Sequence, residues 1–275
     1  MSCKLENKNI YVTSSNRDTT KFPYGNSYTL YLTTPIKDIT TVELLYASVP
    51  NTMYNVTDGL SGLKIEGKFA NVFPGFYSGS GLATAITNSA AGATVSYLEN
   101  EGKFLFTHND TFSLEMLSPE LAALMGFSVG SITATETADS PYKDNSSLDA
   151  HYIKSDRVAE MNPVDGVFLD IVELRTMFNE CTPMGSPLAS QNQNHISSAS
   201  RSFGMIPMDV PNGSTKSFKK DTDYDLFVDY PYPIQKLDRL TVNWVDKNGK
   251  LVHFNGAETN SFILRFHTLR KNLCG

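Results

Sequence analysis

Residues 62–68 (GLKIEGK) have the glycine and lysine spacing of a phosphate-binding loop. Such a loop needs a Ser or Thr directly after the lysine to bind Mg²⁺, and a helix that begins there. Phe69 stands at that position, and the residues around it have the pattern of a strand. We therefore predict a β-turn between two strands at this place.

Three aspartates, Asp221, Asp223 and Asp225, have the one-three-five spacing of a calcium-binding loop. That loop also needs Gly at its sixth position, where the chain turns sharply, and a bidentate Glu at its twelfth. Leu226 and Tyr232 occupy those two positions. The preferred interpretation is a set of solvent-facing carboxylates on a strand edge, and a looser calcium site stays open as the alternative.

The histidines and cysteines are scattered along the chain: His108, His151, His195, His253 and His267, and Cys3, Cys181 and Cys274. No histidine has a second metal ligand at helical or hairpin spacing, although His253 and His267 lie on adjacent predicted strands and could be neighbours. An odd number of widely spaced cysteines favours a reducing compartment over a disulfide framework or a zinc site. The sequence therefore predicts no catalytic residue, no metal ligand and no cofactor.

Two runs place aromatic rings beside prolines, at residues 73–77 (FPGFY) and 230–233 (YPYP). Exposed rings of this kind form sugar-binding platforms or the dry centre of a protein interface, and buried ones form core. We expect Phe73 to lie in the core and the Tyr-Pro run to lie at an interface.

The composition of the chain argues against nucleic-acid and membrane partners. The chain has 275 residues, of which 40% are hydrophobic and only 19% are charged, and its net charge is −6. Without a dense block of Lys and Arg, we expect no nucleic-acid partner. The polar N-terminus lacks the apolar core of a signal peptide, and no run has the apolar length of a membrane span, so we expect no direct membrane insertion.

The stretch 237–269 carries the clearest strand pattern. Leu240, Val242 and Trp244 alternate with polar residues, as in a half-buried strand. Asn248-Gly249 follows, a pair that favours a type I′ hairpin turn. Residues 251–254 are expected to return the chain, and residues 261–267 to form a third strand.

The rest of the chain has the pattern of further short strands interrupted by two helices. The strands are expected at residues 9–13, 27–33, 39–49, 63–66, 68–73, 94–98, 103–107, 166–174 and 225–229. The first helix is expected over residues 80–88, with Leu82 and Ile86 on its buried face. The second should begin at the N-cap Ser118 and end at Gly126 in the left-handed conformation.

This pattern predicts an all-β protein, an antiparallel β-sandwich built as a single jelly roll with two short helices and long loop insertions. We expect one domain over residues 1–275 with an insertion-rich middle at about 128–223, while a second β domain stays open. The loops after Ser128 and Met177 are candidates for subunit contacts, and deletion of residues 190–202 is expected to impair assembly.

Four stretches carry a resemblance to a known group. Residues 44–56 (LLYASVPNTMYNV) form a strand that ends in a Pro-Asn turn, and residues 75–86 form a Gly-Phe-Tyr-Ser step into a short helix. Residues 121–127 form a Leu-x-x-Leu-Met-Gly-Phe helix end, and residues 240–266 form a C-terminal hairpin and last strand. In this order they resemble virion structural proteins of large nucleocytoplasmic DNA viruses, including those of algae.

The resemblance implies a non-enzymatic capsid component built on one jelly roll. Within the group it favours the penton protein, which forms a homopentamer at each icosahedral vertex and contacts neighbouring major and minor capsid proteins. It places the chain in the virion, made and assembled in the host cytoplasm. The alternatives are a minor capsid protein that cements capsomers from beneath the shell, and, in another class, a carbohydrate-binding jelly-roll module for host attachment.

Overall fold

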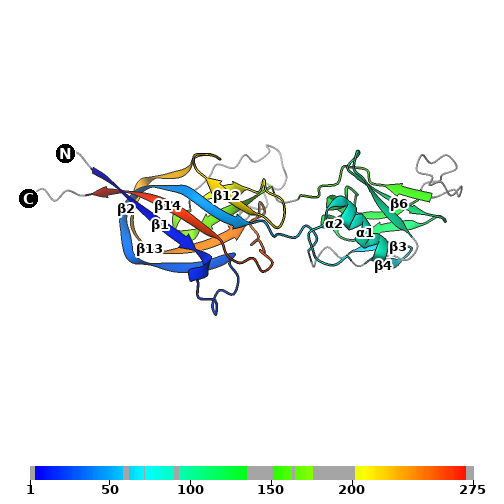
Figure 1. The fold of residues 1–275 in the computed structure, drawn as a ribbon, viewed down its shortest axis with the longest axis horizontal. Coiled ribbons are helices and arrows are strands. Elements are labelled where there is room, and N and C mark those ends of the chain that lie inside the picture. The colour runs from blue at the N-terminus through cyan, green and yellow to red at the C-terminus, as the bar shows by residue number, and fades with distance from the viewer. Residues whose placement is uncertain are drawn as a thin grey trace, which may run out of the picture. The chain divides into compact units, whose positions relative to one another are not determined.

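The computed structural model describes residues 4–57, 62–70, 72–89, 93–134, 151–162, 165–175 and 202–270 (Figure 1). Two compact units make up the chain. Unit 1 consists of Met1–Met53 and Val164–Gly275, and unit 2 consists of Tyr54–Pro163. The sequence predicted one domain with an insertion at about 128–223, whereas the contacts place the interruption of unit 1 at Tyr54–Pro163.

In the described part of unit 1 the regular structure is mainly strands. They are β1 (Lys4–Thr13), β2 (Ser27–Pro50), β10 (Gly166–Ile171), β11 (Gly204–Pro207), β12 (Thr215–Lys219), β13 (Leu226–Val245) and β14 (Ser261–Arg270). Short 3-10 helices follow β1 (η1, Ser14–Asn16) and β10 (η3, Val172–Leu174). The strand order is β1-β14-β2-β13-β10-β11, with β12 also paired to β2.

The strand pairs of unit 1 are nested, and every one of them is antiparallel. The first strand, β1, pairs with the last, β14. The first part of β2 pairs with the second part of β13, the end of β2 pairs with β12, and β10 pairs with β11. Nested pairing of this kind is a long hairpin rolled up on itself, which is the jelly roll that the sequence predicted.

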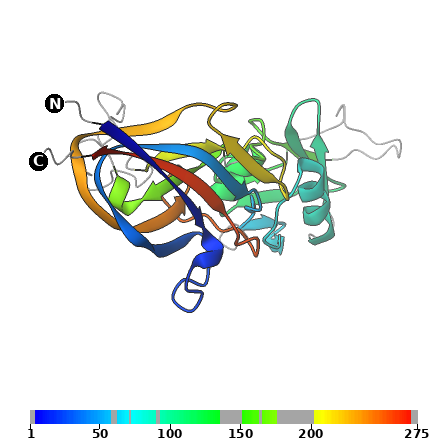
Figure 2. The ribbon, with the colours of Figure 1, turned by 60° about the vertical axis from the view of Figure 1, so that its left-hand side comes forward.

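Two layers result because β2 and β13 are long and bend (Figure 2). One layer contains β1, β14, the second part of β2, β12 and the first part of β13. The other contains the first part of β2, the second part of β13, β10 and β11. The sequence predicted two separate strands at 27–33 and 39–49, and the structure joins them into one bent strand.

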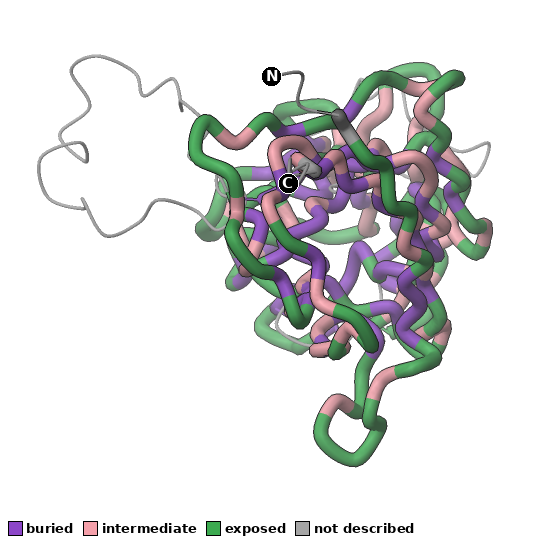
Figure 3. Tube along the Cα trace, turned by 90° about the vertical axis from the view of Figure 1, so that its left-hand side faces the viewer, coloured by how far each residue is buried: buried purple, intermediate pink, exposed green. Residues whose placement is uncertain are grey.

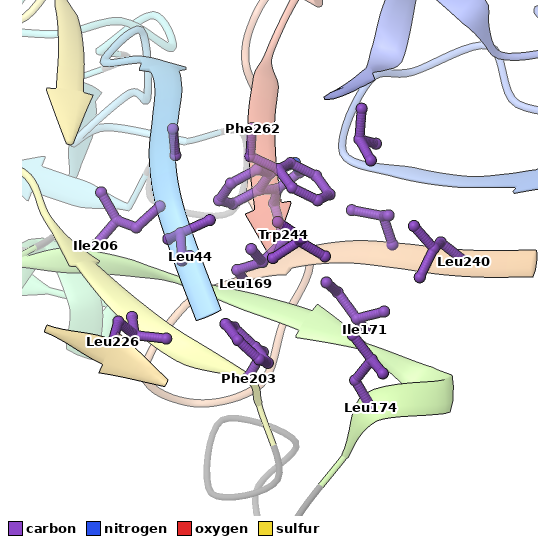
Figure 4. Packing of buried hydrophobic residues seen from close by; sticks show 14 of the residues in the cluster. Leu44, Leu169, Ile171, Leu174, Phe203, Ile206, Leu226, Leu240, Trp244 and Phe262 are labelled. Atoms are coloured by element: carbon purple, nitrogen blue, oxygen red, sulfur yellow. The ribbon is translucent and has the colours of Figure 1, made fainter. Parts of the chain in front are cut away.

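The core of unit 1 lies between these layers (Figures 3 and 4). Leu240, Val242 and Trp244 are fully buried, which confirms the alternation predicted for this strand. The Trp244 ring packs edge-on against Phe262 of β14, with the ring centroids 6.1 Å apart. Leu169 of β10 lies beside Trp244 in the same layer, as its register partner, and belongs to the same cluster.

The hairpin after Trp244 exists, but its turn differs from the prediction. Gly249 has a positive φ of 77°, whereas Asn248 does not, so the turn is not type I′. Asp246 organises it instead, because its Oδ1 accepts the backbone N–H groups of Asn248 and Lys250. The return strand predicted at 251–254 is reduced to one bridge, between Val245 and Leu251.

Unit 2 combines two small sheets with both α-helices. Its elements are β3 (Leu63–Ile65), β4 (Lys68–Ala70), α1 (Gly79–Ser89), β5 (Thr94–Leu98), β6 (Lys103–His108), β7 (Ser113–Met116), α2 (Pro119–Met125), β8 (Gly130–Thr133) and β9 (His151–Lys154). The sheet orders are β4-β3-β7-β8 and β5-β6-β9. Unit 2 has a hydrophobic cluster of its own, in which Phe104, Phe106 and Phe127 are fully buried.

Both helices of unit 2 confirm the predictions. Leu82 and Ile86 of α1 are fully buried. At α2 the Ser118 side chain accepts the backbone N–H of Leu121, and Gly126 takes the left-handed conformation with φ 78°. These ends depend on local sequence because capping is an interaction between neighbours along the chain.

Candidate functional site

The two long strands of unit 1 bend where their pairing is interrupted. Between the pairs Asp229–Thr41 and Ile234–Ile39, strand β13 has four residues outside the ladder and β2 has one. Between Leu237–Ile36 and Arg239–Tyr31 the imbalance is reversed. We call residues 32–35 of β2 and 230–233 of β13 the strand corner. Reciprocal bulges let both strands turn together from one layer to the other.

Prolines explain why the sequence bulges at these places. The corner contains Pro35 on β2, and Pro231 and Pro233 on β13. Proline has no N–H to donate to a ladder, so within sheets it is confined to edges and bulges. The Tyr-Pro-Tyr-Pro run therefore leaves the ladder, and all of its residues except Tyr230 are exposed.

Tyr230 anchors the corner to η3, the short 3-10 helix after β10. Its hydroxyl donates to the backbone carbonyl of Leu174 in η3 at 2.9 Å, and burial raises the pKa of this phenol. Glu173 of the same turn accepts the backbone N–H of Thr241 at 2.7 Å and pairs with Arg239 at 3.1 Å. These contacts hold η3 against β13 and keep the corner from moving independently.

Two tyrosines of the corner region project into solvent. Tyr232 is 89% exposed and Tyr31 is 77% exposed. Large exposed rings on a rigid support are typical of contact surfaces, because little side-chain entropy is lost when they bind. The sequence predicted an interface for the Tyr-Pro run. For Tyr31 the sequence indicated only the strand alternation, which puts it on the face opposite the buried Tyr28.

The opposite end of unit 1 is closed by a buried polar network centred on Asn260. The Oδ1 atom of Asn260 accepts the hydroxyl of Tyr28 and the Nε1–H of Trp244, both at 3.0 Å. Its Nδ2 donates to the carbonyl of Gly25, and its backbone N–H donates to the Ser14 hydroxyl. Burial raises the pKa of Tyr28. The network ties the chain after β1 to the chain before β14.

The aspartates with calcium-loop spacing are used in a different way. Asp223 accepts the ammonium of the buried Lys216 at 2.6 Å and the backbone N–H of Lys219 at 2.8 Å. Asp225 lies 3.9 Å from Lys220, and Asp221 is exposed. The structure thus turns one member of the motif into a buried ion pair and brings no calcium cage together.

The Lys216 pair has perturbed pKa values. Burial by itself would lower the pKa of Lys216, but hydrogen bonds to Asp223 and Asp209 outweigh it, and the pKa is raised. Burial likewise opposes ionisation of Asp223, and the bonds from Lys216 and Lys219 lower its pKa nonetheless. Both groups are therefore charged across the neutral range.

The remaining predicted stretches have structural roles. Residues 62–68 contain the turn between β3 and β4, where Glu66 and Gly67 both have positive φ, so this pair forms the type I′ geometry. Phe73 is 78% exposed, so its expected core position is wrong. His253 lies beside the ring of Tyr24, whereas His267 lies 3.9 Å from Glu43, so the two histidines have different surroundings.

Several predictions lie outside the described residues. These are Cys3, Cys181, Cys274 and His195, and the deletion of residues 190–202. Among the residues that are described, no group of three or more His, Cys, Asp or Glu side chains is arranged to hold a metal ion. In the same part of the chain, no helix has the length and apolar character needed to cross a membrane.

The sequence motifs that carry the resemblance make contacts that stabilise the fold. Asn51 donates through Nδ2 to the carbonyl of Val210, which joins the end of β2 to the loop before β12. Asn55 donates to the carbonyl of Tyr77 and accepts its N–H, so it fixes the step into α1. Phe127 is fully buried after the cap of α2.

Comparison with known proteins gives similarity at two levels. A family model described as "Family of unknown function (DUF5901)" matches residues 4–72. A crystal structure of the selenomethionine-labelled mavirus penton protein has 8% identity and a TM-score of 0.49, covering 96% of this chain and 99% of that chain. A Sputnik virophage structure from cryo-electron microscopy has 12% identity and a TM-score of 0.46, covering 96% and 98%. No curated protein matches.

Proposed function

We propose that this chain is a structural virion protein, the subunit of a closed ring of five copies at the vertex of an icosahedral capsid. The observation that carries the proposal is the nested strand order of unit 1, a jelly roll in which β1 pairs with β14 and β10 with β11. Jelly rolls serve as capsid domains, and this is the fold that the sequence resemblance implies.

The charged groups of unit 1 support a structural role because they hold the fold together. Asp170, which is buried, receives two hydrogen bonds from the Arg175 guanidinium at 2.7 and 2.6 Å. Lys216 is neutralised by Asp223 in the same way. Such pairs fix strands and loops in place, which suits a subunit that must keep its shape in a shell.

The strand corner is the contact surface that we propose for assembly. In a ring, each subunit uses one surface toward one neighbour and a different surface toward the other. Tyr232 and Tyr31 provide exposed aromatic area, and the anchor between Tyr230 and Leu174 holds that area rigid. Partners are then further copies of the chain and the neighbouring major and minor capsid proteins in the virion, which is assembled in the host cytoplasm.

Electron microscopy of the purified chain tests this function. Class averages should contain closed rings with fivefold symmetry, because a heterologous contact repeats until the rotation closes. Rings of another order, or an open filament, would contradict the vertex assignment and leave a minor capsid role as the better interpretation.

A second function is favoured by one observation, the exposure of aromatic rings beside prolines. Phe73 and Tyr232 are more exposed than rings of a packed core and could stack on sugars. A glycan array with the intact chain separates the two functions. Specific glycan binding that is lost in Phe73→Ala or Tyr232→Ala would support a carbohydrate-binding module.

A further inference from the structure

The first part of β2 lies at the border of its layer. On one side it pairs with β13, whereas the strand on the other side of β2, β14, pairs only with residues 39–48. In the described part of the chain, no strand therefore lies beside the other side of residues 27–31. A strand edge of this kind presents unpaired backbone groups with which another chain can pair.

The hydrogen bonds of β13 show which backbone groups of this edge are free. Thr241 donates its backbone N–H to Glu173, on the side of β13 that faces away from β2. Its register partner Thr29 therefore belongs to a pair without backbone hydrogen bonds, and the N–H and C=O of Thr29 point away from β13. The direction alternates along a strand, so the same holds for Ser27 and Tyr31. Among the described residues, none of these backbone groups has a hydrogen-bond partner.

The sequence of this edge lacks the features that keep sheet edges apart. Residues 27–34 (SYTLYLTT) contain no charged residue, no proline and no glycine. An uncovered segment of high β-propensity and low charge is prone to pair with other chains. On the core side, Leu30 and Leu32 pack against the core but are only half-buried. The edge is therefore suited to a further strand that covers it.

The edge formed by β1 is protected by charge. Glu6 and Lys8 are exposed, and their register partners on β14 are the buried Thr268 and Phe266. Directly opposite residues share a face of the sheet, so both charges point to the core side. Inward-pointing charges on an edge strand oppose pairing with another chain.

The remaining edges of unit 1 that the structure describes are short. β11 has four residues, and the Tyr224 hydroxyl donates to the backbone carbonyl of its Met205. β12 has five residues, of which two are lysines. The first part of β13 pairs with β2 only from Leu226 to Asp229. Short edge strands and lysines are common protections against pairing, and residues 27–34 have neither.

We propose that the open edge at residues 27–34 binds an extended segment of a different capsid polypeptide, which adds one strand to the layer antiparallel to β2. The inference rests on the proposed ring of five. Pairing of this edge with the same edge of a second copy needs a twofold axis, which neighbours in such a ring do not have. The other described edges are protected, so a second copy offers no matching strand.

The faces of β2 define the chemistry of the bound segment. On the core side it carries apolar side chains, which cover the exposed parts of Leu30 and Leu32. On the outer face it carries uncharged polar side chains beside Ser27 and Thr29. The ring of Tyr31 projects from that face, whereas the free backbone groups lie in the plane of the sheet, so this contact leaves the ring available for assembly.

Fluorescence anisotropy with the full-length chain tests the edge. The probe is a fluorescein-labelled synthetic peptide in which threonine and valine alternate, with a lysine at each end. Saturable binding of one peptide per chain is expected. A probe residue directly opposite Thr29 shares its outer face and exchanges hydrogen bonds with it, so the threonine N–H groups point toward β2 and the valine N–H groups point away.

Two methylated forms of the probe test this geometry without changing the protein. Methylation of the threonine backbone nitrogens should abolish binding, because it removes the donors that face β2. Methylation of the valine backbone nitrogens is the matched control and should leave the affinity unchanged. Equal binding of the two methylated forms would show a contact that does not use the strand edge, and would overturn the proposal.

Thr29→Pro removes a donor from the protein side. It should weaken binding at least about tenfold, because a carbonyl of the probe loses its partner. The native ladder tolerates this change, since the N–H of Thr29 makes no bond to β13. Thr29→Val is the control, because it keeps the N–H and removes only the hydroxyl contact with Thr241 at 3.4 Å. Both variants should keep the circular dichroism of wild type, and equal affinity of all three proteins would contradict the edge.

Native mass spectrometry of wild type and Thr29→Pro separates this inference from the proposed function. Both proteins should form the ring of five, because the added strand comes from another polypeptide. Rings that do not bind the unmethylated probe would overturn the inference and leave the ring in place. A wild-type dimer that is lost in Thr29→Pro would show that the edge binds a second copy, and would overturn both.

Discussion

Single polar residues decide how the ends of the jelly roll are closed. Asn260 satisfies Tyr28, Trp244 and Gly25 at once, so one side chain joins three segments that are far apart in the sequence. Its role could not be predicted from the sequence, because an Asn in a polar loop looks like any other turn residue. Its hydrogen-bond partners include residues more than two hundred positions away in the sequence.

Asn260→Ala should destabilise the protein by about 3 kcal/mol or more, because it leaves two buried donors and one carbonyl unpaired, at roughly 1–3 kcal/mol each. Urea unfolding followed by tryptophan fluorescence measures this, since Trp244 is the only tryptophan. Asn248→Ala, in the exposed turn, is the control and should change stability by less than about 0.5 kcal/mol. A similar small loss for both variants would show that the hydrogen bonds of Asn260 contribute little to stability.

The Lys216 pair gives a pH-dependent prediction. Asp223 has a lowered pKa in the folded state, so its contribution is present above the ordinary pKa of about 3.9 and is lost as the pH falls through the lower folded value. The pKa of Lys216 is raised, so its contribution is present below about pH 10.4 and is lost above the higher folded value.

Lys216→Ala should therefore cost about 3 kcal/mol at neutral pH, the lower end for a broken buried pair, because Asp209 is largely exposed. The difference from wild type should begin to shrink below about pH 4, the ordinary pKa of an aspartate, and should vanish as the pH falls through the lower folded pKa of Asp223. Lys219→Ala on the same strand is the control, since Asp223 contacts only its backbone N–H. A cost for Lys216→Ala that does not change with pH would contradict the ion-pair explanation.

At the scale of elements, the helix caps could be predicted from the sequence, whereas the register of the strand pairs could not. The caps of α2 depend on neighbours in the chain, and Ser118 and Gly126 were identified from the sequence alone. The bends of β2 and β13 depend on which residues face each other across the ladder, so the sequence showed two strands where there is one. The type I′ turn predicted at Asn248-Gly249 was wrong for a related reason, since Asn-Gly favours a geometry that the hydrogen bonds to Asp246 override.

Substitution of two glycines in unit 2 distinguishes the cost of backbone strain from the cost of a steric clash. Gly126 and Gly67 both have positive φ, at 78° and 72°. A Cβ on Gly126 would collide with the Arg157 carbonyl oxygen, whereas a Cβ on Gly67 has open space. Gly67→Ala should cost about 1–2 kcal/mol from strain alone, and Gly126→Ala should cost at least about 1 kcal/mol more. Equal losses in chemical denaturation would mean that the cap of α2 can move away from Arg157.

At the scale of the whole molecule, each of the two units has its own strand pairs and its own core. The sequence predicted one domain and left a second β domain open, because the pairs that close unit 1 join residues on both sides of unit 2. The predicted jelly roll was correct for unit 1. The residues that interrupt it, Tyr54–Pro163, looked like further strands and helices of the same domain.

The corner tyrosines give the assembly prediction. Tyr232→Ser should lower the fraction of assembled rings at least about tenfold, as loss of a contact worth about 1.4 kcal/mol or more does, without changing the melting temperature of the subunit. Tyr24→Ser, an exposed tyrosine at the opposite end of unit 1, should leave assembly unchanged. Analytical ultracentrifugation of the three proteins measures both effects. Equal assembly of all three would remove the corner from the interface.

Native mass spectrometry of the purified full-length chain, over a range of concentrations, tests the central claim most directly. A vertex subunit should give one dominant assembly with five times the mass of the chain, and no series of larger species, because a heterologous ring is complete once it closes. A chain that stays monomeric at every concentration, or that forms an open series of oligomers, would contradict the proposal that it forms a closed ring of five.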